Sequence, residues 1–351
     1  MLIFVLLEVV SMLEYRYVAN RRDFETFLQE KCSSREIYSS IRVLVETPAT
    51  IANLGPGFDI LAVSLEAPRD VIEIEYFNKG SELEIISSGI EIPVHENIVY
   101  RIADIYHQVC GGGSLRIKLS KNIPVSRGLG SSGASVVGAV VGLSIVYGLR
   151  LSEGEIISLA GYGEGIIAGE PHYDNVSASL LGGLIVIDHE YSKILRIEIP
   201  LSMWIGVVIP NIPVPANKTL YARSVLPESL PRKQVIHQIS LVSKIIIGVL
   251  RNDLRILGEA VSRDYVAEPY RGKLIPYYNE IKELALKKGA YGFNISGAGP
   301  SVFFIASKDE EARELALEIS KYLRGRGVDN SFFVTKVSNR GALVKVIKYE
   351  R

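Results

Sequence analysis

The stretch Pro124-Val-Ser-Arg-Gly-Leu-Gly-Ser-Ser-Gly-Ala-Ser135 joins a glycine-rich turn to a pair of serines. Gly128 and Gly130 lack a Cβ atom, so the backbone can turn tightly there and approach a ligand closely. The paired serines stand where a helix would begin, because residues 134–146 are mostly small and β-branched. That run is too apolar for an exposed helix, and it predicts a helix buried in a domain core.

The turn and the start of this helix together predict a phosphate site. The first N–H groups of a helix have no partner within it and lie at the positive end of its dipole. Serine hydroxyls can bond phosphate or coordinate Mg²⁺, and Arg127 adds positive charge. A Walker loop is excluded because GxxxxGK[ST] is absent. A dinucleotide-binding fingerprint would need an alternating strand–helix pattern, which does not follow. A purely structural glycine turn remains the alternative.

Length and composition describe an ordinary globular protein of two domains. The 351 residues exceed the roughly 100–200 of one domain. Apolar residues make up 48% of the chain and charged residues 22%. The 39 basic and 39 acidic residues cancel, so no overall field attracts nucleic acid or an anionic membrane. We therefore expect a cytoplasmic protein that binds neither.

The first forty residues and the two cysteines are harder to interpret. Residues 1–10 are apolar but reach only half of the roughly 20 residues that span a bilayer. Residues 1–40 are thus an N-terminal extension of unknown role, either peripheral or a helix that docks on the body. Cys32 and Cys110 could form one bridge, but free thiols in a reducing cytoplasm are the simpler interpretation.

The pattern from residue 41 onward favours an α+β fold. Strand-like and helical segments mix without a regular βαβ period, which argues against a doubly wound parallel sheet. The proline-rich stretch Pro210–Pro215 indicates a nearby domain boundary. We expect one domain over residues 41–200 and a second over 201–351, the second including a strand at 342–347.

The central loop resembles that of the GHMP kinases, and two further blocks of this family are present. They are Thr47–Asp59 (TPATIANLGPGFD) and Asn294–Ser301 (NISGAGPS). The resemblance extends from about Arg42 to the C-terminus. It implies an ATP- and Mg²⁺-dependent small-molecule kinase and a homodimer. The ATP-binding N-terminal domain would resemble domain 2 of ribosomal protein S5, and the C-terminal domain would be ferredoxin-like, with the active site between them.

Segments between these blocks resemble the homoserine kinases more than the sugar or mevalonate kinases. These segments are Glu96–Tyr100, His172–Val176 with Leu181–Gly183, Thr219–Arg223 with Val225–Pro227, and Val266–Arg271. The resemblance therefore implies L-homoserine as the substrate. A GHMP kinase for another small alcohol, or a non-catalytic nucleotide-binding relative, remains an alternative.

The resemblance assigns the acceptor-binding residues. Arg223 and Arg271 would bind the substrate carboxylate, since a guanidinium pairs with two oxygens at once. Asp59 and His172 would bind the ammonium group. Without the resemblance, each of these residues would more often be a surface, cap or ordinary hydrogen-bonded side chain.

The catalytic residues also follow from the resemblance. Asn53 and Asn175 would orient the hydroxyl or the γ-phosphate, with Thr219 beside the transferred group. Other branches are thought to use an aspartate as base where homoserine kinases present an asparagine, here Asn175. Phosphoryl transfer depends more on positioning and charge neutralisation than on early deprotonation. We therefore expect no strong protein base, with Asp174 as the rival candidate.

The same comparison implies the nucleotide and metal ligands. Ser132 and Glu164 would hold Mg²⁺, and Asn97 and Val99 would line the adenine pocket. The residues expected at the phosphates are Pro124, Arg127, Gly128, Leu129, Gly130, Ser131, Ser132, Gly133 and Ala134. The third block would support this loop, unless it is only a turn between strands.

Overall fold

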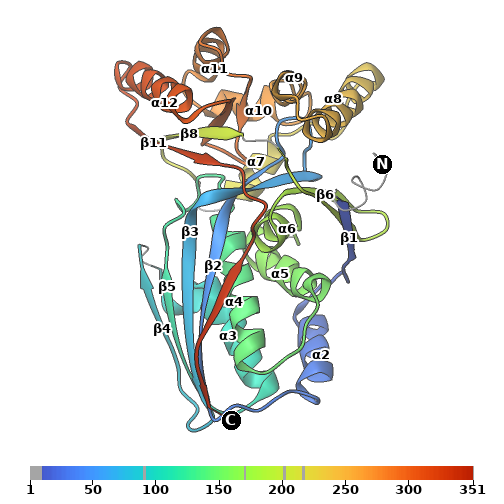
Figure 1. The fold of residues 1–351 in the computed structure, drawn as a ribbon, viewed down its shortest axis with the longest axis vertical. Coiled ribbons are helices and arrows are strands. Elements are labelled where there is room, and N and C mark those ends of the chain that lie inside the picture. The colour runs from blue at the N-terminus through green and yellow to red at the C-terminus, as the bar shows by residue number, and fades with distance from the viewer. Residues whose placement is uncertain (1–9, 90–91, 170, 201–202, 216–217, 351) are drawn as a thin grey trace.

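The computed structural model describes residues 10–350 except 90–91, 170, 201–202 and 216–217. Two lobes, each built on a sheet, stack along the long axis of the molecule (Figure 1). The first lobe holds an eight-stranded sheet with the order β1-β7-β6-β3-β2-β12, and β5 pairs with both β3 and β4. Its strands are β1 (Val10–Glu14), β2 (Ser40–Ala52), β3 (Leu61–Phe77), β4 (Leu83–Ser88), β5 (Ser114–Ser120), β6 (Leu184–Asp188), β7 (Lys193–Ile197) and β12 (Leu343–Glu350).

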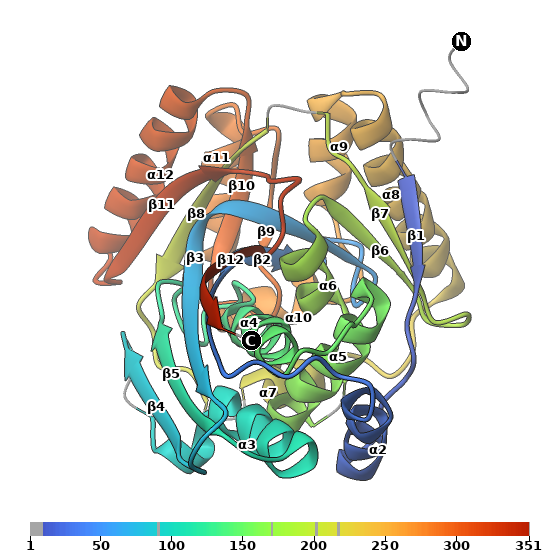
Figure 2. The ribbon, with the colours of Figure 1, turned by 60° about the horizontal axis from the view of Figure 1, so that its bottom comes forward.

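The helix expected after the glycine turn is α4, and it forms the centre of the first lobe. Almost every residue of α4 (Ser131–Val146) is buried. Figure 2 shows α4 almost end-on with its neighbouring helices around it. Gly138 and Gly142 face the sheet, where a Cβ atom would meet Ile72 and Ile74. The small residues therefore let the helix lie close to β3. The other helices are α2 (Arg21–Cys32), α3 (Ile98–Cys110), α5 (Glu153–Ala168) and α6 (Asp174–Leu181), with the 3₁₀ turn η1 (Val94–Glu96).

The second lobe has an antiparallel four-stranded sheet in the order β11-β8-β10-β9. Numbered within the lobe, this is the order 4-1-3-2 expected of a ferredoxin-like domain, so that prediction is confirmed. The strands are β8 (Trp204–Pro210), β9 (Gly292–Ile295), β10 (Val302–Ala306) and β11 (Asn330–Lys336). The helices are α7 (Lys218–Ser224), α8 (Arg232–Leu250), α9 (Leu254–Val261), α10 (Glu268–Arg271), α11 (Tyr278–Lys287) and α12 (Asp309–Arg324), with the 3₁₀ turn η2 (Gly272–Leu274).

The two faces of the smaller sheet serve different cores. Val208 and Phe304 pack with α11 and α12. Ile205 and Phe303 point the other way, into a core that they share with α8, α9 and residues of the first lobe such as Ile51. One continuous apolar core thus crosses between the lobes and holds them in one relative orientation.

The end of the chain returns to the first lobe. The strand expected at residues 342–347 forms β12, but it pairs with β2 from Leu343↔Glu46 to Glu350↔Ser40. Figure 1 shows this C-terminal strand running down beside β2. The larger sheet therefore contains a strand that the sequence pattern placed in the second domain, because the pattern predicts a strand but not its partner.

The described part of the N-terminal extension is also integrated into the first lobe. β1 pairs with β7, and α2 buries Phe24 and Leu28. Cys32 at the end of α2 forms a disulfide with Cys110 at the end of α3, with a Cα–Cα distance of 5.4 Å. The interpretation of two free thiols is therefore wrong for this structure. The apolar start at residues 1–9 lies outside the described residues.

Within the described part of the chain, α8 is the one helix long and apolar enough to cross a membrane by length and composition alone. Its inner face carries Leu241, Ile245 and Val249, which belong to the core between the lobes. Packing on the smaller sheet thus accounts for half of its apolar residues.

Candidate active site

A cavity of about 470 Å³ lies where the three sequence blocks meet. The lining includes most of the residues expected from the sequence: Asn53, Asp59, Asn97, Arg127, Gly128, Leu129, Gly130, Ser131, Ser132, Glu164, His172, Asn175, Thr219, Arg223 and Arg271. Four expected residues do not line it. Val99 is buried within α3, Gly133 and Ala134 are buried in α4, and Pro124 lies half-buried before the loop.

The glycine loop is built to pack between the other two blocks. Gly128 and Gly130 have φ values of 79° and 67°, in the left-handed region that favours glycine. A Cβ atom on Gly128 would collide with the backbone of Ser296, and one on Gly130 with the side chain of Thr50. Ser296 Oγ donates to Gly128 O at 2.6 Å. The loop ends at Ser131, where α4 begins, so the helix N-terminus opens into the cavity.

Two buried oxygens mark a corner beside this loop. Ser132 Oγ and Glu164 Oε2 have no hydrogen-bond partner among the described residues. Burial raises the pKa of Glu164 to about 7, although the neighbouring Ser132 and Lys121 side chains favour its ionised form. Unpaired buried oxygens are costly unless a ligand completes them. Mg²⁺ typically takes one or two protein oxygens together with phosphates and waters, and this pair fits that donor set.

The residues expected to bind the acceptor form a second group in the lining of the same cavity. Arg223 Nη2 donates to Asp59 Oδ2 at 2.7 Å and lies 3.2 Å from His172 Nδ1. The guanidinium groups of Arg223 and Arg271 both lie over the Phe58 ring, at 5.5 and 5.1 Å from its centroid. The residues expected to bind a carboxylate and an ammonium group therefore form one cluster.

Arg271 is the buried cation of this cluster. Its Nε donates to Ala222 O and its Nη1 to Gly297 O, both at 3.0 Å. It forms no ion pair with a described residue, and burial lowers its pKa to about 10 although Asp59 opposes the shift. A buried guanidinium without a carboxylate partner is well suited to bind an anionic ligand.

Asn53 and Asn175 also line the cavity. Asn53 Nδ2 donates to Gly297 O at 3.2 Å, and its Oδ1 accepts from Asp59 N at 3.1 Å. Asn175 Oδ1 accepts from Thr50 Oγ1 at 2.6 Å. Both asparagines are thus fixed by neighbours from the first and third blocks. Thr219, at the start of α7, lines the same region.

Asp174 is engaged by its own helix. Its Oδ1 accepts from the backbone N–H of Asn175 at 2.7 Å and from Asn175 Nδ2 at 3.2 Å. Burial raises its pKa, and the nearby Asp59 adds to the shift while His172 opposes it. The carboxylate, on the first residue of α6, therefore orients Asn175.

Sequence reasoning missed two lysines in this cavity. Lys218 Nζ donates to Gly299 O at 2.7 Å, and burial, with help from Arg271 and Arg127, lowers its pKa to about 8. Lys121 pairs with Asp70 and donates to Ser131 O at 2.8 Å, which ties the end of β5 to the start of α4. The only sequence signal was that Lys218 directly precedes a residue assigned by resemblance.

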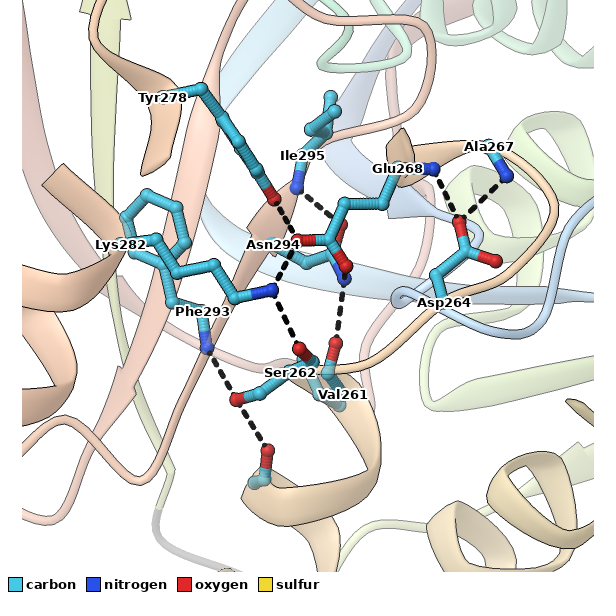
Figure 3. Close-up of polar contacts among 11 residues, drawn as sticks. Val261, Ser262, Asp264, Ala267, Glu268, Tyr278, Lys282, Phe293, Asn294 and Ile295 are labelled. Carbon is cyan, nitrogen blue, oxygen red and sulfur yellow. Dashed lines mark hydrogen bonds and ion pairs between the residues drawn. The ribbon is translucent and has the colours of Figure 1, made fainter. Parts of the chain in front are cut away.

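A buried polar network holds the helix that carries Arg271 (Figure 3). Asp264 Oδ2 accepts from the backbone N–H groups of Ala267 and Glu268 at 2.9 and 2.7 Å, which caps α10. Glu268 Oε1 accepts from the Tyr278 hydroxyl at 2.8 Å and pairs with the Lys282 ammonium. A four-residue helix has little stability of its own, so these bonds fix its position.

Family models and relatives agree with this geometry. Residues 97–183 match the N-terminal domain of GHMP kinases and residues 245–325 their C-terminal domain. A homoserine kinase from Pyrococcus horikoshii is 38% identical over 305 residues, which cover 86% of this chain and 99% of the relative. One from Aeropyrum pernix is 36% identical over 275 residues, covering 76% and 88%.

Solved structures agree as well. The crystal structure of homoserine kinase from Cytophaga hutchinsonii superposes with a TM-score of 0.77 at 28% identity, covering 89% of this chain and 99% of that one. A mevalonate kinase from Staphylococcus aureus, at 17% identity and a TM-score of 0.56, shares the fold. The two-lobed α+β architecture, the glycine loop at its centre and these relatives show that the chain belongs to the GHMP kinase family, in its homoserine kinase branch.

Proposed function

We propose that the chain is an ATP:L-homoserine O-phosphotransferase, which transfers the γ-phosphate of ATP to the side-chain hydroxyl and forms O-phospho-L-homoserine for threonine biosynthesis. The observation that carries this proposal is a single cavity that is lined both by the glycine loop with the start of α4 and by the Asp59–Arg223–Arg271 cluster. A phosphate donor and a zwitterionic acceptor can therefore meet within it. Homoserine kinases among the relatives support the same substrate.

The acceptor cluster suits an amino acid with a short side chain. The substrate carboxylate would take the unpaired donors of Arg271 and share Arg223, while the ammonium group would face Asp59. An acid without an amino group, such as mevalonate, would leave Asp59 without a cation from the substrate. Asn53 and Asn175 would then present the hydroxyl toward the glycine loop.

The glycine loop and α4 suit the triphosphate. The phosphates would lie against residues 127–132, with the adenine near Asn97, whose side chain caps α3. Ser132 and Glu164 would hold Mg²⁺, which when bound neutralises phosphate charge. Arg127 and Lys218 add positive charge on the protein side. Together these groups stabilise the charge of a loose phosphoryl-transfer transition state.

We infer that the hydroxyl attacks without a strong protein base. Asp174 Oδ1 is already occupied by two N–H donors of Asn175, and the Asn175 amide cannot accept a proton at neutral pH. Positioning by Asn53, Asn175 and Thr219 would supply most of the rate, and the hydroxyl proton would pass to the transferred phosphate.

A coupled ADP-release assay with L-homoserine, L-serine, mevalonate and galactose side by side tests the function. We expect kcat/KM for homoserine to exceed the others by about 10²-fold or more, as for a site whose buried polar groups each need a partner. A preference for another alcohol would indicate a different GHMP kinase. Nucleotide binding without ADP release on any of the four would indicate a non-catalytic relative.

We propose that the enzyme is a homodimer formed through α8. Its outer face exposes Ile236, Ile239, Ile247 and Leu250. These residues lie at equal intervals on either side of Ser243, four and seven positions away in each direction. A two-fold interface needs a patch that is complementary to itself, and a stripe that is symmetric about a small residue satisfies that need.

We also propose that the enzyme is cytoplasmic. We propose further that the boundary between its two domains lies between β7 and β8. Residues 41–200 with β12 would be the ATP-binding domain, and residues from 201 to the start of β12 the second domain. The Cys32–Cys110 disulfide is compatible with a cytoplasm, since intracellular proteins of hyperthermophilic archaea retain such bonds. Fractionation of the source cells tests this placement, and recovery of the enzyme outside the cytoplasmic fraction would contradict it.

A further inference from the structure

Two tyrosines of the N-terminal extension pack against Tyr173, a neighbour in sequence of two residues that line the cavity. Tyr15 follows β1 directly, and its buried ring lies 4.3 Å from that of Tyr173, with the planes tilted by 40°. Tyr17 approaches the same ring at 6.4 Å. Tyr173 stands between His172 and Asp174, both of which line the cavity. The extension therefore packs against the segment that carries the acceptor-binding residues.

The Tyr173 ring is enclosed from the other side by α5. Gly161 of α5 leaves the space that the ring occupies, because a Cβ atom there would collide with it. The extension in turn grips α5. Arg16 N donates to Ser158 Oγ at 2.8 Å. The backbone carbonyl of Glu14 occupies the space that a Cβ atom on Gly154 would need. Tyr173 is thus clamped between the extension and the helix that carries Glu164.

The second half of the extension packs against α3 and α5, two helices that also carry or adjoin residues of the cavity lining. Phe24 of α2 packs against Tyr106 of α3 and Tyr162 of α5, with ring centroids 6.0 and 5.2 Å apart. The Cys32–Cys110 disulfide joins the C-terminal ends of α2 and α3. The N-terminal end of α3 is capped by Asn97, the residue expected near the adenine. The extension therefore contacts Tyr173, α3 and α5.

We propose that residues 10–38 act as an intramolecular brace of the active site, with Tyr15 as a positioning residue. Tyr15 touches no reacting group. It acts through Tyr173, whose ring fixes the backbone of residues 172–175 and so the placement of His172 and Asn175. The kinetic consequence of this inference rests on the proposed function, whereas the brace itself can be observed without any substrate.

The test compares Tyr15→Ala with Tyr15→Phe and a matched control, Tyr191→Ala, which removes an exposed tyrosine from the turn between β6 and β7. Hydrogen–deuterium exchange of the peptide covering residues 171–181 is measured first. We expect faster exchange in Tyr15→Ala only. In the kinase assay we expect its KM for homoserine to rise by about tenfold while the KM for ATP changes by less than about twofold, as for loss of acceptor positioning. Tyr15→Phe keeps the ring and should behave like the parent.

Unchanged exchange and unchanged KM in Tyr15→Ala, even with a lower melting temperature, would overturn the proposal and leave Tyr15 as a packing residue only. If Tyr15→Ala does not fold, Tyr15→Leu, which retains apolar volume but not the ring, replaces it with the same expectations. Altered exchange in a chain that does not phosphorylate homoserine would support the brace and reject the proposed function. The two failures are therefore distinguishable.

Discussion

Neighbouring residues in this cavity have different tasks although their side chains are nearly the same size. Asp174 accepts two N–H groups from Asn175, and Asn175 in turn accepts a hydrogen bond from Thr50. The Asp174 carboxylate thus orients the Asn175 amide, which lines the cavity. Whether a carboxylate acts as a base depends on the direction of its free oxygen rather than on its presence in the site.

The first prediction concerns this aspartate. Asp174→Asn retains an oxygen that can accept from Asn175 N, so the orientation of Asn175 should survive. We expect turnover within about threefold of the parent, whereas loss of a general base costs about 10²–10⁴-fold. Steady-state kinetics at saturating homoserine provides the measurement. A thousandfold loss with an unchanged melting temperature would contradict the base-free scheme.

The second prediction is a pH dependence of metal binding. The pKa of Glu164 is raised to about 7 in the folded chain, so the carboxyl is mostly protonated below that pH. A metal must displace this proton, and the apparent Mg²⁺ affinity in the presence of ATP should fall as the pH decreases from 8 to 6, approaching about tenfold per unit.

Glu164→Gln provides the control for this dependence. The amide has no proton to lose, so only the smaller pH dependence of the nucleotide itself should remain. The measurement is the Mg²⁺ concentration at half-maximal activity, or at half-maximal nucleotide binding for the variant. Equal pH profiles for both proteins would exclude Glu164 as the titrating ligand.

The third prediction concerns Lys218, which lines the cavity half-buried near Arg127, Glu164 and Arg271 and forms no ion pair with a described residue. Lys218→Met should lower kcat by about 10²-fold or more, as for loss of one transition-state donor. Affinity for an ATP analogue should fall more than affinity for ADP, because the γ-phosphate lies nearest the acceptor. Equal losses for both nucleotides in calorimetry would assign Lys218 a structural role in the Gly299 loop.

At the scale of elements, glycines decide how closely segments approach. Gly138 and Gly142 bring α4 against β3, and Gly161 makes room for the Tyr173 ring on α5. The positions of α4 and α5 therefore depend on the absence of side chains at these glycines as much as on apolar contacts. The connection between α2 and α3 is different, since a covalent bond joins their ends.

The fourth prediction is that this disulfide stabilises the first lobe. It joins residues 78 positions apart. Closing a loop of that length lowers the conformational entropy of the unfolded chain and so raises the free energy of unfolding by up to about 4 kcal/mol. Dithiothreitol should therefore lower the urea midpoint of the parent but leave a Cys32→Ser/Cys110→Ser variant unchanged. Full alkylation of the parent, denatured without a reductant, would show that the bond does not form.

In the whole molecule, one apolar core joins the lobes, and α8 carries a row of exposed apolar side chains. The first observation means that the cavity lies between parts that are held together by shared packing. The isoleucine and leucine side chains on the outer face of α8 form a stripe on the outside of the smaller lobe. Burial of such a stripe between two copies of the chain would be favourable, which is the physical basis of the proposed dimer.

The fifth prediction follows from this stripe. An antiparallel pair of α8 helices would also bring Arg232 and Lys233, at the N-terminus of one helix, to the negative C-terminal end of the other. Ile239→Lys should convert a dimer into a monomer of 38.7 kDa in light scattering. Leu317→Lys, which changes an exposed leucine on α12, is the control. A parent that is monomeric at all concentrations, or a variant that remains dimeric, would exclude this interface.

Local chemistry made much of the active site predictable from the sequence. A glycine turn followed by serines and a small, apolar run specifies a loop, a helix start and a buried helix within a few residues, and α4 begins at Ser131 as expected. The acceptor residues were assigned by resemblance alone, since an isolated arginine or aspartate has no distinguishing pattern. Their gathering around Phe58 is a tertiary result.

The α+β class and the succession of glycine turn and buried helix could be predicted from the sequence, because they depend on short-range spacing and turn chemistry, and the family followed from the resemblance of three motif blocks. Long-range packing, by contrast, brings β12 to β2, the extension to Tyr173, Cys32 to Cys110 and Lys218 to the cavity. Each of these contacts joins residues far apart in the chain. Periodicity predicts which side of a strand or helix is buried, but the partner that buries it is set by the packing of the whole molecule.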